Sequence, residues 1–189
     1  MVTDLQTAVG RSYSFALAPG SCLAVTGPSG SGKSLLLRAI ADLDPARGTL
    51  RLDDRDRARM PATEWRSLVR YLPPNAVFWS ATAEQILADN AQAVSAVGVP
   101  ADRAEAPISE LSSGEKQRLA LVRALTPAPR VLLADEPTSA LDEESTLLVE
   151  AYLQAFLRDG GAMILVSHDQ SQVERLSDHY IDLEDPASD

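Results

Sequence analysis

Residues 27–34 read Gly27-Pro28-Ser29-Gly30-Ser31-Gly32-Lys33-Ser34, which matches the phosphate-binding loop pattern GxxxxGK(S/T). The apolar run Cys22–Thr26 before them predicts a strand, and the helical spacing of apolar residues after Ser34 predicts a helix. Glycines let such a loop turn tightly enough to aim several backbone N–H groups at an anion, and the helix N-terminus adds partial positive charge. A turn that merely joins strand to helix is the weaker interpretation, because four such fixed positions arise by chance in fewer than roughly one in a hundred chains of this length. The stretch therefore predicts a phosphate-binding site.

A triphosphate site also needs groups that handle the metal and the attacking water. Lys33 is predicted to reach the β- and γ-phosphates, and the Ser34 hydroxyl to hold Mg²⁺. The run 131–134 is apolar without alternation, typical of a buried parallel strand, and Asp135 and Glu136 follow it. Asp135 is predicted to hold Mg²⁺ through its water shell, and Glu136 to take a proton from water. Without the loop, an acidic pair after a strand is more often a helix N-cap.

Short strand-like runs alternate with helix-like runs along the chain, which is the pattern of an α/β fold. Strands are also predicted over residues 49–53, 69–72 and 163–166, and helices over residues 63–68, 115–125 and 143–158. The helix after the loop is expected to continue to Leu43. Residues 82–106, rich in alanine and polar residues, predict one or two short helices in a small inserted lobe. The tail after Asp182 is expected to fray.

Composition and charge narrow the class of protein. The chain has 189 residues, 45% of them hydrophobic, and a net charge of −10, which indicates a folded globular protein. Residues 135–189 carry 2 basic and 14 acidic side chains, and so acidic a face repels nucleic acid and anionic lipid. The single cysteine, Cys22, allows no intrachain disulfide, so a cytoplasmic location is expected. No apolar run approaches the roughly 20 residues that cross a bilayer, so a membrane role is expected only through a partner.

Three further segments carry a resemblance to a known family. They are Leu111-Ser112-Ser113-Gly114-Glu115, similar to the signature sequence LSGGQ; Ser139-Ala140-Leu141-Asp142, which matches the D-loop; and His168, at the place of the switch histidine. With the loop and the acidic pair they follow the order found in ATP-binding cassette (ABC) transporter ATPase subunits. The short length resembles bacterial ATPase subunits such as those of iron exporters. The resemblance implies a P-loop NTPase with a mainly parallel sheet core, a small antiparallel β part and a short inserted helical lobe near residues 76–126, all within one nucleotide-binding domain over residues 1–189.

The resemblance also implies partners and roles. Ser112 and Gly114 precede a helix, so its N-terminus is a second anion site. In the family such residues contact the γ-phosphate bound at Lys33 of a second cassette, which implies a head-to-tail homodimer or pseudo-dimer. The resemblance implies that Glu136, His168 and Lys33 are catalytic and that the chain binds ATP and Mg²⁺. It also implies a peripheral location on the inner face of the plasma membrane, beside a separate transmembrane subunit. Taken alone, Ser112 would be an ordinary helix cap.

The sequence departs from the family at several positions. Pro74 stands where the family has a glutamine, and proline has no side-chain donor or acceptor, so Asn75 is predicted to replace the amide in part. No aromatic residue stands at the distance upstream of Lys33 from which the family stacks one on adenine, and the nearest candidate, Tyr13, lies too close to the loop in sequence. Base recognition is therefore expected to be loose, with GTP also accepted. Phe78 and Trp79 either contact a membrane partner or pack inside the lobe.

Three other functions are compatible with parts of the pattern. Pro74 and Ser113 would fit a nucleotide-dependent clamp or sensor with little turnover. A soluble cassette ATPase in DNA repair or translation conflicts with the acidic residues 135–189. A small-molecule P-loop kinase would leave residues 111–114 and 139–142 without a role.

Overall fold

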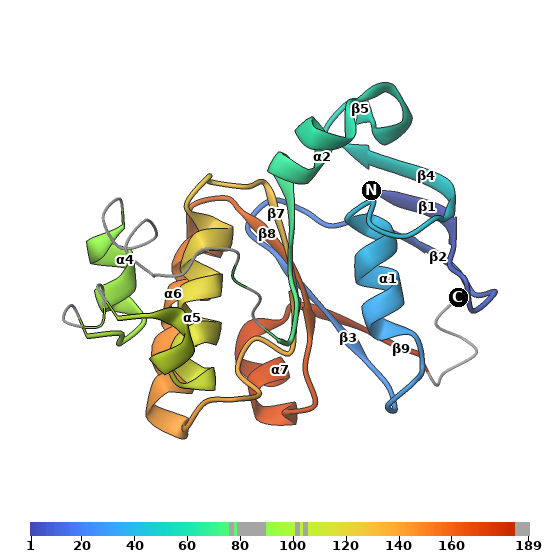
Figure 1. Cartoon of the computed structure of the whole chain (residues 1–189). Coiled ribbons are helices and arrows are strands. Elements are labelled where there is room, and N and C mark those ends of the chain that lie inside the picture. Colours follow the sequence, from blue (N-terminus) through green and yellow to red (C-terminus); the bar gives the residue numbers. More distant parts are fainter. Residues whose placement is uncertain (76–77, 79–89, 101–102, 104–105, 184–189) are drawn as a thin grey trace.

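The computed structural model describes residues 1–75, 78, 90–100, 103 and 106–183, which form two sheets with helices around them (Figure 1). The parallel sheet has five described strands in the order β6-β7-β8-β3-β9. Their bounds are β3 Cys22–Thr26, β6 Val69–Leu72, β7 Val131–Asp135, β8 Ala162–Val166 and β9 His179–Asp182. The antiparallel sheet has the order β2-β1-β4-β5, with β1 Val2–Gln6, β2 Ser12–Phe15, β4 Arg47–Leu52 and β5 Arg55–Asp56.

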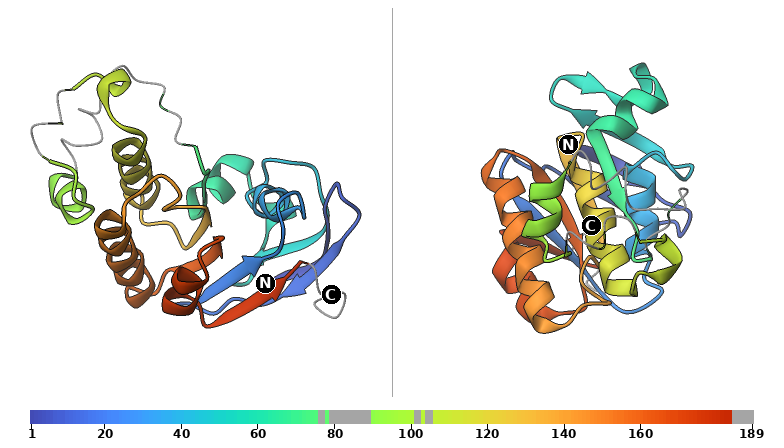
Figure 2. Two further views of the ribbon diagram at one scale, coloured as in Figure 1. Left: turned by 90° about the horizontal axis from the view of Figure 1, so that it is seen from below. Right: turned by 60° about the vertical axis from the view of Figure 1, so that its left-hand side comes forward.

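Helices cover both faces of the parallel sheet. Their bounds are α1 Lys33–Ile40, α2 Ala62–Leu68, α4 Ala91–Ala96, α5 Ser113–Leu125, α6 Glu143–Arg158 and α7 Gln170–Leu176. Figures 1 and 2 show α1 and the antiparallel sheet on one side, and α5 and α6 on the other. Within the described ranges, no helix is both long and apolar enough to span a membrane. The predicted α/β fold, with a mainly parallel core and a small antiparallel part, is confirmed.

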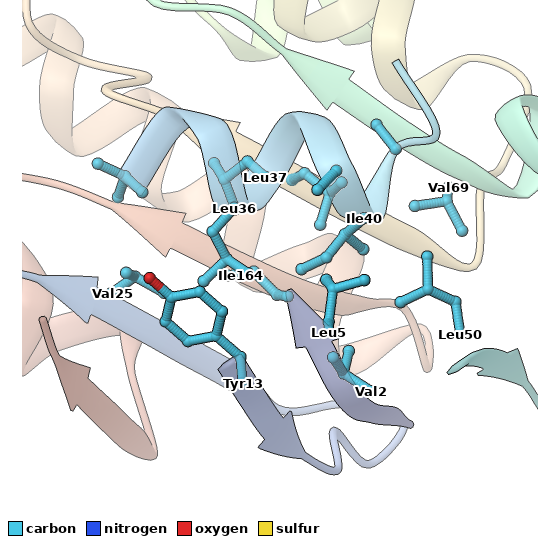
Figure 3. Close-up of a cluster of buried hydrophobic side chains, with 14 of the residues drawn as sticks. Val2, Leu5, Tyr13, Val25, Leu36, Leu37, Ile40, Leu50, Val69 and Ile164 are labelled. Atoms are coloured by element: carbon cyan, nitrogen blue, oxygen red, sulfur yellow. The ribbon is translucent and has the colours of Figure 1, made fainter. Parts of the chain in front are cut away.

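Side chains of the central strands alternate between two cores. Leu133 and Ile164 belong to a cluster with α1 and the antiparallel sheet, which Figure 3 shows around Ile164. Leu132 and Met163 belong to the cluster with α5 and α6. All four are at most 2% exposed. Burial on both faces explains why the sequences of these strands carry no polar alternation.

Helix α1 ends at Ile40, earlier than the predicted end at Leu43. The indole N–H of Trp65 donates a hydrogen bond of 2.9 Å to the Ile40 carbonyl. Asp42 then takes a positive φ of 59°, and its carboxylate pairs with Arg57. Contacts from α2 and the segment before it therefore end the helix, and these contacts are not visible in the local sequence.

Helix α5 is shared between the inserted lobe and the parallel sheet. Its Leu119 lies in one buried cluster with Val94 of α4, whereas Leu121 lies in the cluster that includes β7 and β8. Phe78 packs against both clusters, which favours a packing role within the lobe. Trp79 lies outside the described residues. Helix α5 thus packs both against the lobe and against the parallel sheet.

Candidate functional site

The phosphate-binding loop joins β3 to α1, as predicted. Gly27, Gly30 and Gly32 have positive φ angles of 130°, 82° and 100°, a region where other residues are strained. Gly32 also caps α1, and a Cβ added there would lie 3.1 Å from Cγ2 of Val9. The conformation of the loop therefore depends on its glycines.

Lys33 is held inside this loop. Lys33 is the first residue of α1, and it is 7% exposed. The ammonium donates hydrogen bonds of 2.7 Å to the Gly27 carbonyl and 2.8 Å to the Pro28 carbonyl. A buried ammonium beside a helix N-terminus creates a positive potential that suits phosphate oxygens.

One pocket gathers most of the predicted site residues. Its described lining includes Ser29, Gly30, Gly32, Lys33, Ser34, Pro74, Asp135, Glu136 and His168. The loop follows β3, Asp135 is the last residue of β7 with Glu136 after it, and His168 comes after β8. These residues meet in one pocket because the carboxyl ends of parallel strands lie at one edge of a sheet. Gly27, Pro28 and Ser31 belong to the loop without being part of that described lining.

Asp135 and Ser34 offer the oxygen ligands that Mg²⁺ prefers. Asp135 is 1% exposed, and its Oδ2 accepts a hydrogen bond of 2.9 Å from the Tyr71 hydroxyl. Burial and then the Asp135 charge raise the pKa of Tyr71, so the phenol stays a donor. The described residues contain no cluster of three or more His, Cys, Asp and Glu side chains, so these two donors would need nucleotide and water oxygens to complete a Mg²⁺ shell. The contact of Tyr71 with Asp135 depends on the pairing of β6 with β7, so the sequence carried no signal for it.

Glu136 has an unusual backbone and a perturbed carboxyl group. Its φ is 53°, in the left-handed region, and its N–H donates to the Val166 carbonyl at 2.9 Å. Oε1 lies 3.2 Å from Nε2 of His168. Burial raises the pKa of Glu136, while His168 and Lys33 act in the opposite direction. A carboxylate with a raised pKa is a stronger base, which suits proton transfer from water.

Pro74 lines the same pocket as Lys33 and Asp135, which we call the phosphate pocket. It presents no side-chain hydrogen-bonding group there. Asn75 is exposed. The compensating role of Asn75 stays a prediction.

The signature segment, residues 111–115, leads into α5 and is not part of the described pocket lining. Ser112 is the N-cap: its Oγ accepts from the Glu115 N–H at 3.1 Å, and Glu115 Oε2 accepts from the Ser112 N–H at 2.8 Å. Arg103 of the lobe donates to Glu115 Oε1 at 2.9 Å and, as the main cause, lowers its pKa. A Cβ on Gly114 would lie 3.1 Å from the Ala140 carbonyl, so the D-loop packs closely on this helix start. Within one chain, Ser112 therefore acts as a helix cap.

Asp142 and Tyr13 both make their described contacts within the chain. Asp142 caps α6, where its Oδ1 accepts from the Ser145 N–H at 2.7 Å. Tyr13 is 3% exposed and packs in the core with Leu36 and Leu37 (Figure 3). A ring buried in this way cannot stack on a nucleotide base, so Tyr13 was wrong as an adenine-stacking candidate.

Comparison with known proteins gives the family. Residues 11–139 match the family described as ABC transporter. The chain is 36% identical over 186 residues to "Aliphatic sulfonates import ATP-binding protein SsuB 2" of Xanthomonas axonopodis pv. citri, with 92% of this chain and 62% of that protein covered. It is 34% identical over 206 residues to "Hemin import ATP-binding protein HmuV" of Roseobacter denitrificans, with 93% of this chain and 77% of that protein covered. The chain therefore spans about three fifths to three quarters of these relatives. Both are named for import, whereas the sequence resemblance was to iron-export subunits.

Solved structures agree on the fold. The "ATP binding subunit of ABC transporter" superposes with a TM-score of 0.85 at 22% identity, covering 96% of this chain and 84% of that one. A dimeric bacterial ABC transporter cassette superposes with a TM-score of 0.83 at 21% identity, covering 96% and 94%. From its sequence relatives and its fold, the chain belongs to the ABC transporter family, as an ATP-binding cassette.

Proposed function

We propose that this chain binds ATP with Mg²⁺ and hydrolyses it to power a membrane transporter, with residues 1–189 acting as one nucleotide-binding domain that carries an inserted lobe near residues 76–126. The observation that carries the proposal is the single pocket in which the phosphate-binding loop meets Asp135, Glu136 and His168. These are the groups that in-line attack of water on a γ-phosphate requires. The names of the relatives support the same function.

Each residue has a distinct part in the reaction. Lys33 and the loop N–H groups would stabilise charge on the phosphates. When bound, Mg²⁺ would neutralise phosphate charge, held by the Ser34 hydroxyl and, through water, by Asp135. Glu136 would accept a proton from the attacking water, and His168 would orient that water and the γ-phosphate.

The second half of each site would come from another cassette. Ser112 and Gly114 lie apart from the phosphate pocket, at an N-terminus of the 13-residue helix α5 that suits an anion. A head-to-tail dimer would place them on the γ-phosphate bound by the partner, with Asp142 at the interface. The dimeric cassette among the similar structures supports this arrangement. A separate transmembrane subunit would hold the dimer at the cytoplasmic face of the membrane. Nucleic acid would not be a partner.

The proposed chemistry is tested by Glu136→Gln. Phosphate release should fall at least about a hundredfold, the size of a general-base contribution, while ATP still binds. The exposed Glu174 of α7 provides the control, since Glu174→Gln should leave the rate unchanged. Undiminished phosphate release by Glu136→Gln would contradict the assignment.

The dimer is tested by Ser112→Asp. Aspartate caps a helix as well as serine does, so the chain should keep its melting temperature. Its negative charge would repel the partner's γ-phosphate, so light scattering with ATP and Mg²⁺ should find monomers where the wild type forms dimers. If both proteins dimerise equally, the shared site is disproved.

A second candidate, a clamp that binds ATP with little turnover, is favoured by Pro74 in the pocket lining. Single-turnover hydrolysis by the wild type separates the two. An ATPase converts bound ATP to ADP within one catalytic cycle, whereas a clamp keeps ATP intact while it dimerises.

A further inference from the structure

A glutamine of α5 contacts Glu136, the proposed base, of the same chain. Gln117 of α5 is 2% exposed, and its Nε2 donates a hydrogen bond of 2.7 Å to the Glu136 carbonyl. The two residues are 19 positions apart in the sequence. The helix that begins at Ser112 is thus bonded to the residue that would act as base.

The contact falls on a strained point of the backbone. Glu136 has φ 53°, and a non-glycine residue keeps such a conformation only where its surroundings fix it. Its carbonyl also accepts from the Ser139 N–H at 3.3 Å and from Ser139 Oγ at 3.1 Å. Among the described residues, Gln117 supplies the shortest of these contacts and the one from outside residues 136–139.

Stability alone does not account for a glutamine at this position. Gln117 Oε1 is buried and has no hydrogen-bond partner among the described residues. A buried unsatisfied oxygen costs folding free energy, and a methionine of similar length would avoid that cost. A buried group left unsatisfied in this way needs an explanation, and a functional role is one that fits its contact with Glu136.

We propose that Gln117 is a positioning residue that fixes the catalytic carboxylate of Glu136 in its own chain. The inference rests on the proposed ATP hydrolysis. Gln117 is not part of the described lining of the pocket that holds Lys33 and Glu136. It would act through the peptide that carries Glu136, and so on the direction in which the carboxylate meets the attacking water. A Cβ on Gly114, three residues earlier on α5, would lie 3.1 Å from the Ala140 carbonyl, so the start of α5 contacts the segment after Glu136 at a second point.

Gln117→Met tests the contact because it keeps the length of the side chain and removes the donor. kcat should fall by about tenfold, the effect of losing one hydrogen bond that orients the base. The Kd for ATP should stay within about twofold of the wild type, and the melting temperature should stay equal or rise. Gln154→Met, the same change at a half-buried glutamine of α6, should leave kcat unchanged.

Mixed dimers show in which site Gln117 acts. One chain carries Glu136→Gln, so the only active base belongs to the other chain. Gln117→Met on the chain with intact Glu136 should lower the rate by the same tenfold. Gln117→Met on the Glu136→Gln chain should leave it unchanged. The reverse pattern would mean that Gln117 acts through Ser112 on the partner's nucleotide, and would overturn the proposal.

Two further outcomes also overturn it. An unchanged kcat shows that the contact does not position the base, and a parallel loss of kcat, ATP binding and melting temperature shows a structural role alone. Failure of the proposed function looks different, because the wild type itself would then release no phosphate from Mg²⁺ and ATP.

Discussion

Replacing Tyr71 by phenylalanine isolates one hydrogen bond at the predicted metal site. The change removes only the hydroxyl, which donates at 2.9 Å to Oδ2 of Asp135, and it keeps the ring that packs in the core. Asp135 is 1% exposed, so its carboxylate depends mainly on donors of the protein. The variant therefore leaves a buried carboxylate with one partner fewer.

The size of the effect follows from the chemistry of that bond. A hydrogen bond to a charged group contributes about 1.5–3 kcal/mol to the free energy of unfolding. For a domain of this length the melting temperature should fall by roughly 3–12 °C. Loss of a residue that orients a metal-binding carboxylate weakens metal binding by about 10–100-fold. The Mg²⁺ concentration for half-maximal hydrolysis should rise by that factor.

The assay is a Mg²⁺ titration of phosphate release at saturating ATP, with melting curves recorded in chelator. Tyr180→Phe is the control, because Tyr180 of β9 is 74% exposed and the change removes the same hydroxyl at the surface. A lower melting temperature with an unchanged Mg²⁺ requirement would refute the reasoning. Tyr71 would then stabilise the fold without orienting Asp135.

Four further predictions follow from other contacts. Because burial raises the pKa of Glu136, its ionisation destabilises the folded state at neutral pH; Glu136→Gln should raise the melting temperature there, with the gain vanishing below about pH 4. Burial also raises the pKa of Cys22 to about 12, so at pH 8 a thiol reagent should modify it only as fast as the chain unfolds. Arg103→Ala should lower the melting temperature at neutral pH, where Glu115 is ionised, and the loss should shrink as falling pH protonates Glu115. The loss should also be smaller in a Glu115→Gln background, where the bond from Arg103 to the Glu110 carbonyl remains. Asn75→Ala should reduce the steady-state ATPase rate if Asn75 replaces the amide missing at Pro74, and an unchanged rate would end that hypothesis.

Local sequence predicted the parts of the site that depend on neighbours along the chain. The glycines of residues 27–34 specify their own turn, and the apolar run before Asp135 specifies a buried strand that ends in the pocket. Parallel pairing then brings these ends together, so Lys33 and Glu136 could be placed in one site before any contact was known.

Contacts set by register and packing could not be predicted in this way. Tyr71 reaches Asp135 because β6 pairs with β7 in the register Tyr71 to Leu133, which no spacing within either strand reveals. The burial of Tyr13 did have a signal, since Ser12–Phe15 alternates polar and aromatic residues as a half-buried strand does.

The strained conformation of Glu136 links the fold to the proposed chemistry, in which Glu136 is the base. A left-handed residue at the end of β7 costs free energy that the strand alone cannot offset. Three separate parts of the chain hold it: Val166 on β8, Gln117 on α5 and Ser139 in the D-loop. A regular strand would have continued past Asp135, with Glu136 as its next residue. The turn at Glu136 ends it instead, and the base lies beside His168 in the phosphate pocket because the elements packed around it fix that turn.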